Sequence, residues 1–121
     1  MKLVSDKTIL YSTRRKHLPA FGGGIYYIYA WSKLIYIGRT WRFSQRLYKH
    51  SHELHFKEYG VTHIRLLQYE YENDLDFYKE ERRQIALHEP VINMKPRRSF
   101  ATAELRQTHR AALQHLREKF G

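Results

Sequence analysis

The sequence predicts one small α/β domain. The chain has 121 residues, enough to enclose a single hydrophobic core. Two runs of β-branched and aromatic residues, 25–31 and 34–37, are typical of neighbouring strands, and residues 61–71 predict a third strand. After the second and third runs, apolar residues recur at helical spacing. These three observations together indicate a domain that combines a sheet with helices.

The first two runs predict a β-hairpin that turns at residues 31–33, although this turn contains no Gly, Asn or Pro. Alternation along a strand places Tyr26 on the same face as Ile28 and opposite Ile25. Tyr36 can therefore share a face with Tyr26, and two phenol groups would lie close together. In a chain with 10 Tyr, such a pair can also arise from packing alone.

Residues 41–56 predict a helix, because apolar residues such as Phe43 and Leu47 recur near helical spacing. Arg46 and His50 are four residues apart, so on this helix they would be neighbours at the edge of the apolar stripe. An arginine and a histidine at a helix edge are common, so the pair by itself does not indicate a function.

Residues 75–88 predict a second helix, with Leu75, Tyr78 and Ile85 in its buried stripe. Glu81 occupies the position between them. A carboxylate at an inward position must pair with a cation, bind a metal or be neutralised, since an unpaired buried charge is costly.

Pro90 ends this helix, and Asn93 is placed either to cap a turn or to hydrogen-bond back to the first strands. A C-terminal helix is predicted at residues 102–120, with a narrow apolar stripe that would dock on the core. No apolar run reaches membrane length and no secretory signal pattern is visible, so we expect a soluble, cytoplasmic protein without a membrane partner.

The charge of the chain indicates a nucleic-acid partner. The formal net charge is +10, distributed as +4 in residues 1–23, +1 in residues 24–93 and +5 in residues 94–121. The flanks are therefore predicted to be a basic N-terminal arm and a basic C-terminal helical extension that hold the DNA backbone, although solvated basic segments fit the sequence about as well. The candidate phosphate-binding residues of the flanks are Arg14, Arg15, Lys16, Arg97, Arg98, Arg106 and Arg110.

A characteristic order of residues runs through the central segment. Gly24-Ile25-Tyr26 precedes Tyr36-Ile37-Gly38, and these triplets are followed by Arg39, Arg46, His50, Glu81, Pro90 and Asn93. In this order the sequence resembles the GIY-YIG endonuclease family over residues 24–93. The spacing looks most like the repair branch of that family, whereas His50 is similar to a histidine of phage homing and restriction members.

The resemblance implies a nuclease core at residues 24–93, with a central antiparallel or mixed sheet of about three strands flanked by helices. It also implies a metal-dependent DNA endonuclease that uses one metal ion. Glu81 would be the protein ligand of one Mg²⁺ or Mn²⁺, and Tyr26 would be the general base. Because a free phenol has a pKa of about 10, Tyr26 needs nearby positive charge. Arg46 and Arg39 would supply that charge and hold the scissile phosphate.

The remaining residues of the pattern would support this chemistry. Tyr36 and His50 would orient the attacking water or relay its proton, with His50 titrating near working pH. Asn93 would hold the site in place, and Gly24 and Gly38 belong to the structural motif.

Other functions fit parts of the sequence. The domain could bind DNA without cutting it, or act only as a homodimer or with a targeting protein. The histidines at 50, 52 and 55 could suggest zinc, but they spread over more than one helical face and the chain has no Cys, so we do not expect a zinc site.

Overall fold

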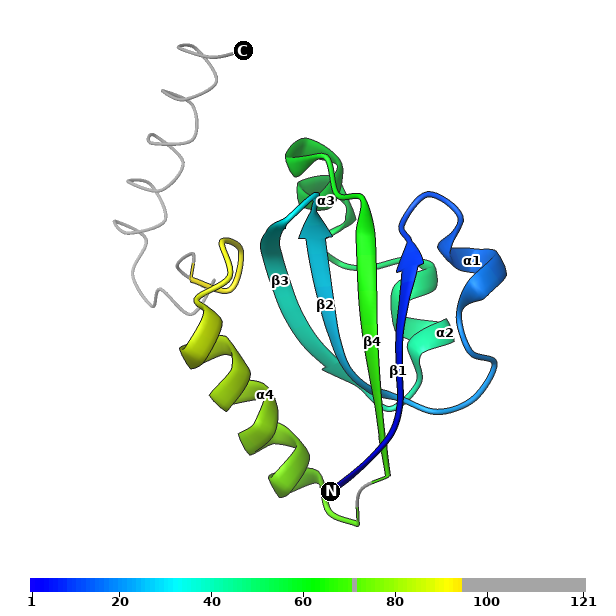
Figure 1. Cartoon of the computed structure of the whole chain (residues 1–121), viewed down its shortest axis with the longest axis vertical. Coiled ribbons are helices and arrows are strands. Elements are labelled where there is room, and N and C mark those ends of the chain that lie inside the picture. Colours follow the sequence, from blue (N-terminus) through cyan, green and yellow to red (C-terminus); the bar gives the residue numbers. More distant parts are fainter. Residues whose placement is uncertain (71, 95–121) are drawn as a thin grey trace, which may run out of the picture.

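The computed structural model describes residues 1–70 and 72–94, which form a four-stranded antiparallel sheet with helices on both faces (Figure 1). The predicted C-terminal helix, together with Arg97, Arg98, Arg106 and Arg110, lies outside the described residues. The strands are β1 (Lys2–Leu10), β2 (Gly24–Ala30), β3 (Lys33–Thr40) and β4 (His63–Glu70), in the order β1-β4-β2-β3. The helices are α1 (Arg14–His17), α2 (Phe43–Tyr48), α3 (Glu53–Tyr59) and α4 (Asp74–His88).

The sheet has two faces with a separate hydrophobic cluster on each. Tyr26 and Ile28 of β2 pack with Phe43 of α2 and Phe56 of α3. On the opposite face, the alternate residues of β2 pack against α4 through Phe77 and Ile85. The predicted alternation along the hairpin is therefore confirmed.

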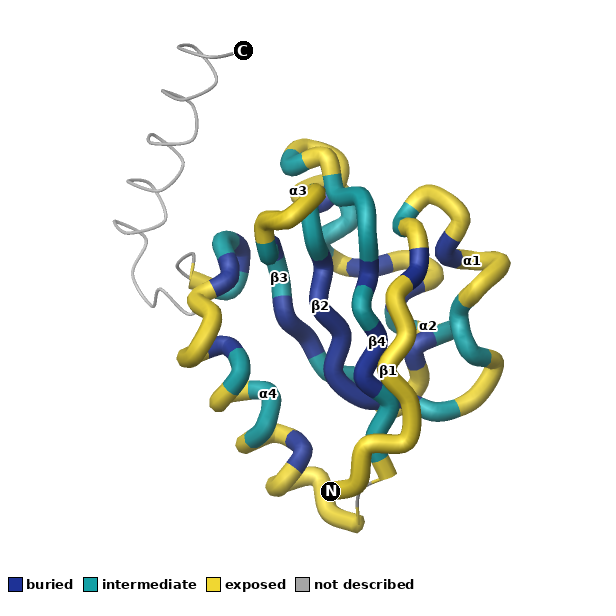
Figure 2. The backbone as a smooth tube through the Cα atoms, viewed as in Figure 1, coloured by how far each residue is buried: buried dark blue, intermediate teal, exposed yellow. Residues whose placement is uncertain are grey.

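The sheet contains one strand more than the sequence predicted. β1, which falls within the predicted basic arm, pairs along its length with β4, and Arg65 forms a bidentate ion pair with Asp6 at 2.8 and 2.9 Å. β1 is an edge strand whose residues are nearly all exposed (Figure 2). A strand that buries neither face shows no alternation of polar and apolar residues, so this pattern could not identify it.

The hairpin lies where it was predicted, with β2 and β3 joined by a tight turn. Trp31 adopts a positive φ of 55°, which gives this turn its left-handed residue without Gly or Asn. Tyr26 is opposite Gly38, and Ile28 is opposite Tyr36. Tyr26 and Tyr36 are therefore diagonal neighbours on one face, and their ring centroids are 6.0 Å apart.

The helix predicted at residues 41–56 is instead two short helices, α2 and α3, separated at residues 49–52. His50 lies in this break and not on a helix with Arg46. Its ring packs among aromatic side chains, 4.9 Å from the ring of Phe56 and 5.3 Å from that of Tyr36. Burial of His50 in the core accompanies the interruption of the helix.

α4 begins one residue earlier than predicted, with Asn73 accepting a hydrogen bond from the N–H of Asp76 at its start. Its buried stripe also differs, because Phe77 and Ile85 pack on the sheet whereas Leu75 and Tyr78 are exposed. Glu81 lies four residues from each of the buried pair, so its inward position is nevertheless confirmed. Within the described part of the chain, no helix has the length and apolarity needed to cross a membrane.

Candidate active site

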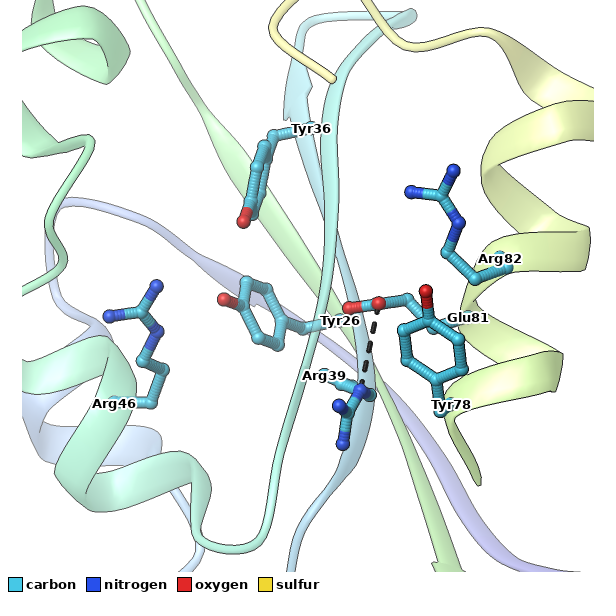
Figure 3. A pocket seen from close by; sticks show the side chains of 7 residues that line it. All are labelled: Tyr26, Tyr36, Arg39, Arg46, Tyr78, Glu81 and Arg82. Atoms are coloured by element: carbon cyan, nitrogen blue, oxygen red, sulfur yellow. Dashed lines mark ion pairs between the residues drawn. The ribbon is translucent and has the colours of Figure 1, made fainter. Parts of the chain in front are cut away.

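A cleft of about 410 Å³ opens around the edge strand β3 (Figure 3). β2 and β3 contribute tyrosines and an arginine, α2 contributes a second arginine, and α4 forms the opposite wall. Its lining residues are Tyr26, Tyr36, Arg39, Arg46, Tyr78, Glu81 and Arg82. The tertiary structure therefore brings together five of the predicted site residues, which are spread over more than 50 positions of the sequence.

Tyr26 is almost fully buried, and its hydroxyl group lies 2.7 Å from Nε2 of His50. A Cβ atom at Gly38 would overlap the Tyr26 phenol, so only glycine allows the ring to lie across β3 at this point. A Cβ atom at Gly24 would likewise overlap the carbonyl oxygen of Leu67. These contacts give the two motif glycines a steric reason.

Burial and the local charges act in opposite directions on the two phenols. Burial raises the pKa of Tyr26 above its ordinary value, and neighbouring Tyr36 adds to the shift, while Arg46 opposes it. Burial also raises the pKa of Tyr36, against the lowering influence of Arg46. Arg46 is therefore the positive charge that acts on both hydroxyl groups. Nη2 of Arg46 donates a hydrogen bond to the hydroxyl oxygen of Ser51 at 3.2 Å.

His50 differs from the sequence prediction in its ionisation. It is 5% exposed, and burial lowers its pKa to about 3, with Arg46 and His52 adding to the effect. The sequence had predicted that His50 titrates near neutral pH. This prediction is wrong, because a buried imidazolium among other cations is unfavourable. Nδ1 of His50 accepts a hydrogen bond from the N–H of His52 at 3.0 Å, so the neutral ring carries its proton on Nε2 and donates it to Tyr26.

Glu81 faces the cleft from α4, and its side chain is 15% exposed. Nε of Arg39 lies 3.6 Å from its carboxylate, and Nη1 of the same arginine lies 3.1 Å from Asp74. Arg39 is thus in the cleft as predicted, with two acidic neighbours.

The donors in the cleft fit a hard divalent cation that is held by one carboxylate and keeps most of its ligands as water and phosphate. Glu81 supplies the hard oxygen, and the cleft leaves room for a phosphate beside it. Among the described residues, no group of three or more His, Cys, Asp or Glu side chains is arranged to enclose a metal.

Asn93 lies beside the site and not in its lining. Its Oδ1 accepts a hydrogen bond from the N–H of Ile37 at 2.7 Å, and its Nδ2 donates to the carbonyl of Ile37 at 2.8 Å. Of the two alternatives that the sequence left open for Asn93, the structure shows the hydrogen bonds back to the first strands. They hold the open edge of β3 between Tyr36 and Gly38.

Arg14 is buried and does not belong to a DNA-binding arm. Its Nε donates to the carbonyl of Leu47 at 2.8 Å, and its Nη2 lies 2.8 Å from the carboxylate of Glu53. It connects α1 to α2 and α3, so its predicted role as a phosphate contact is wrong. Arg15 stacks at 4.2 Å on the ring of Tyr48, and both it and Lys16 are exposed. Their DNA-binding role stays a prediction.

Two lining residues were not identified from the sequence. Tyr78 was predicted to be buried, yet it is 45% exposed and faces the cleft. Arg82 carried no prediction. Tyr78 lies three residues before Glu81 and so shares its helical face, and this spacing was the signal that could have identified it. Arg82 directly follows Glu81, and no such spacing pointed to it.

No protein-family model matches the sequence, and no curated protein sequence matches it. Two solved structures have a similar fold: they are point mutants of the GIY-YIG N-terminal endonuclease domain of UvrC from Thermotoga maritima, each bound to its catalytic divalent cation. Both have a TM-score of 0.54, with sequence identities of 19% and 18%, and the alignments cover 70% of this chain and 96% of theirs. The chain therefore has a GIY-YIG-like fold, as the sequence resemblance implied.

Proposed function

From this fold and this cleft, we propose that the protein is a divalent-metal-dependent endonuclease that hydrolyses DNA phosphodiester bonds. The observation that carries the proposal is the convergence of two phenols, arginines and one carboxylate in a single cleft. The similar UvrC domains, which are nuclease domains with a bound catalytic cation, support it. The net charge of +10 also suits a polyanionic substrate.

Hydrolysis requires a base for the attacking water, positive charge for the phosphate and stabilisation of the leaving oxygen. In the proposed mechanism, Tyr26 first loses its own proton to solvent. The resulting phenolate takes a proton of the water as the water oxygen attacks phosphorus, the bond between phosphorus and the 3′ oxygen breaks, and the leaving 3′ oxygen takes a proton from solvent. Arg46 stabilises that phenolate and binds the phosphate. Arg39 is a second candidate for binding the phosphate. A divalent cation bound at Glu81 would supply Lewis-acid stabilisation of the phosphate and the leaving oxygen.

His50 acts in this mechanism as a positioning residue. Its Nε2–H donates to the hydroxyl oxygen of Tyr26, so it orients the phenol and would stabilise the phenolate. Because its other nitrogen already accepts a hydrogen bond from the backbone, neutral His50 is poorly placed to take the proton of Tyr26. We therefore assign the charge that activates Tyr26 to Arg46.

The test is cleavage of supercoiled plasmid with Mg²⁺, Mn²⁺ or EDTA, comparing wild type with Glu81→Ala. Glu80→Ala is the matched control, because it removes a neighbouring carboxylate that pairs with Arg83 and does not line the cleft. We expect metal-dependent cleavage that Glu81→Ala abolishes and Glu80→Ala retains. Equal loss in the two variants would contradict the metal-ligand assignment.

The same assay addresses the alternatives. DNA binding without cleavage by wild type would support a non-catalytic DNA-binding protein or an enzyme that requires a targeting partner. Nicked product would indicate one active site acting at a time, whereas linearisation would require a second protomer or a second visit. Mass measurement of the DNA complex would then separate a homodimer from two successive visits.

A further inference from the structure

We infer that Tyr78 and Arg82 form a binding subsite for an unpaired nucleotide next to the scissile phosphate. In this subsite the Tyr78 ring stacks on the base and the Arg82 guanidinium binds the phosphate of that nucleotide. The inference rests on the proposed function, since it adds a substrate class to the same cleft. It starts from the two lining residues that have no role in the proposed mechanism.

Tyr78 and Arg82 are four residues apart on α4, so their side chains are neighbours on one helical face. Both line the cleft on the wall that also carries Glu81 (Figure 3). A nucleotide that extends along this wall from a phosphate at Glu81 would meet both side chains. Their position beside Glu81 in the cleft lining is the geometric basis of the inference.

Tyr78 has the features of a stacking platform. It is 45% exposed although it is aromatic, and the Arg39 guanidinium carbon lies 5.2 Å from its ring centroid. This cation–π contact supports the ring in a fixed place while much of it stays accessible. Bases in a duplex already stack on each other, so a protein ring of this kind favours an unpaired base.

Arg82 supplies positive charge on the α4 wall. Arg39 already lies close to Asp74 and Glu81, which offset its charge, and Arg46 faces the phenols from α2. Among the ion pairs of the described residues, none involves Arg82. The next residue, Arg83, forms a bidentate ion pair with Glu80 at 2.6 and 3.0 Å and does not line the cleft.

This difference between neighbouring arginines provides a matched control. We would measure the affinity of the full chain in EDTA, without cleavage, for a fluorescein-labelled duplex with a short unpaired central segment and for a fully paired duplex of the same length. Arg82→Ala and Arg83→Ala remove the same charge from the same helix. We expect Arg82→Ala to weaken binding about tenfold and reduce the slope of log Kd against log salt by about 1, with little effect of Arg83→Ala.

Tyr78→Leu and Tyr78→Phe test the stacking. We expect Tyr78→Leu to weaken binding to the duplex with the unpaired segment by about tenfold and to leave the fully paired duplex unchanged. Tyr78→Phe keeps the ring and should retain affinity. Circular dichroism melting would verify that each variant is folded, which is expected because both side chains are exposed.

Several results would overturn the inference. The first is an equal effect of Arg82→Ala and Arg83→Ala on affinity. The second is an equal loss of affinity for both DNA forms in Tyr78→Leu, and the third is no binding of either DNA by wild type. Because binding is measured in EDTA, a protein that binds as expected but cuts no plasmid with metal would contradict the proposed function while supporting the subsite. A protein that cuts plasmid but whose DNA binding is unchanged by substitution of Tyr78 or Arg82 would support the proposed function and contradict the subsite.

Discussion

The buried imidazole of His50 should make folding stability depend on pH in a way that one substitution removes. In the folded protein its pKa is lowered to about 3, mainly by burial, with Arg46, His52 and Arg14 adding to the shift. In the unfolded chain the pKa returns to about 6.5. The unfolded state therefore binds more protons below pH 6.5, and the stability contributed by neutral His50 decreases as the pH falls.

The magnitude follows from these two pKa values. Between pH 6.5 and pH 3 the free energy of unfolding should decrease by about 1.4 kcal/mol per pH unit from this residue. From pH 7 to pH 4.5 the contribution amounts to about 2.5 kcal/mol. Because His50 is 5% exposed, solvent screens this contribution little.

The assay is urea unfolding at pH 7, 5.5 and 4.5, comparing wild type with His50→Gln. Glutamine keeps an amide that can hydrogen-bond to Tyr26 but does not titrate. The carboxylates are the same in both proteins, so their contribution cancels in the difference. We expect wild type to lose about 2.5 kcal/mol more than the variant over this range. Equal losses would refute the depressed pKa of His50.

Three further predictions follow from the site and its supports. Cleavage by wild type should increase about tenfold per pH unit from pH 6 to 9 without an inflection from His50, since burial raises the pKa of Tyr26; a plateau below pH 8 would contradict the raised value. Tyr26→Phe should lower kcat at least 100-fold while the protein stays folded at the assay temperature, and a smaller effect in single-turnover cleavage would exclude it as the base. Asn93→Ala should destabilise the fold by about 1–2 kcal/mol in urea, because both backbone groups of Ile37 lose a partner; unchanged stability would mean that water replaces the amide.

The hairpin and the positions of several site residues were predictable from sequence because they depend on local geometry. The alternation of side chains on β2 follows from the backbone and places Tyr26 and Tyr36 on one face. The 3.6-residue period of a helix likewise placed Glu81 inward. The fold class was also predicted correctly, and the hydrogen bonds of Asn93 were one of two predicted alternatives, whereas the chemical role of each site residue is still to be measured.

Other features depend on contacts between distant parts of the chain, and only the tertiary structure decided them. Pairing with β4 makes residues 2–10 a strand, and contacts with α2 and α3 bury Arg14. Packing in the core places His50 in a break between helices and depresses its pKa. Packing on the sheet also buries Phe77 of α4 and leaves Tyr78 in the cleft. The sequence alone therefore determined the local geometry and the residue types of the site, because these depend on near neighbours in the chain. Burial, charge environment and exposure arise from residues tens of positions away, so the tertiary structure determined them.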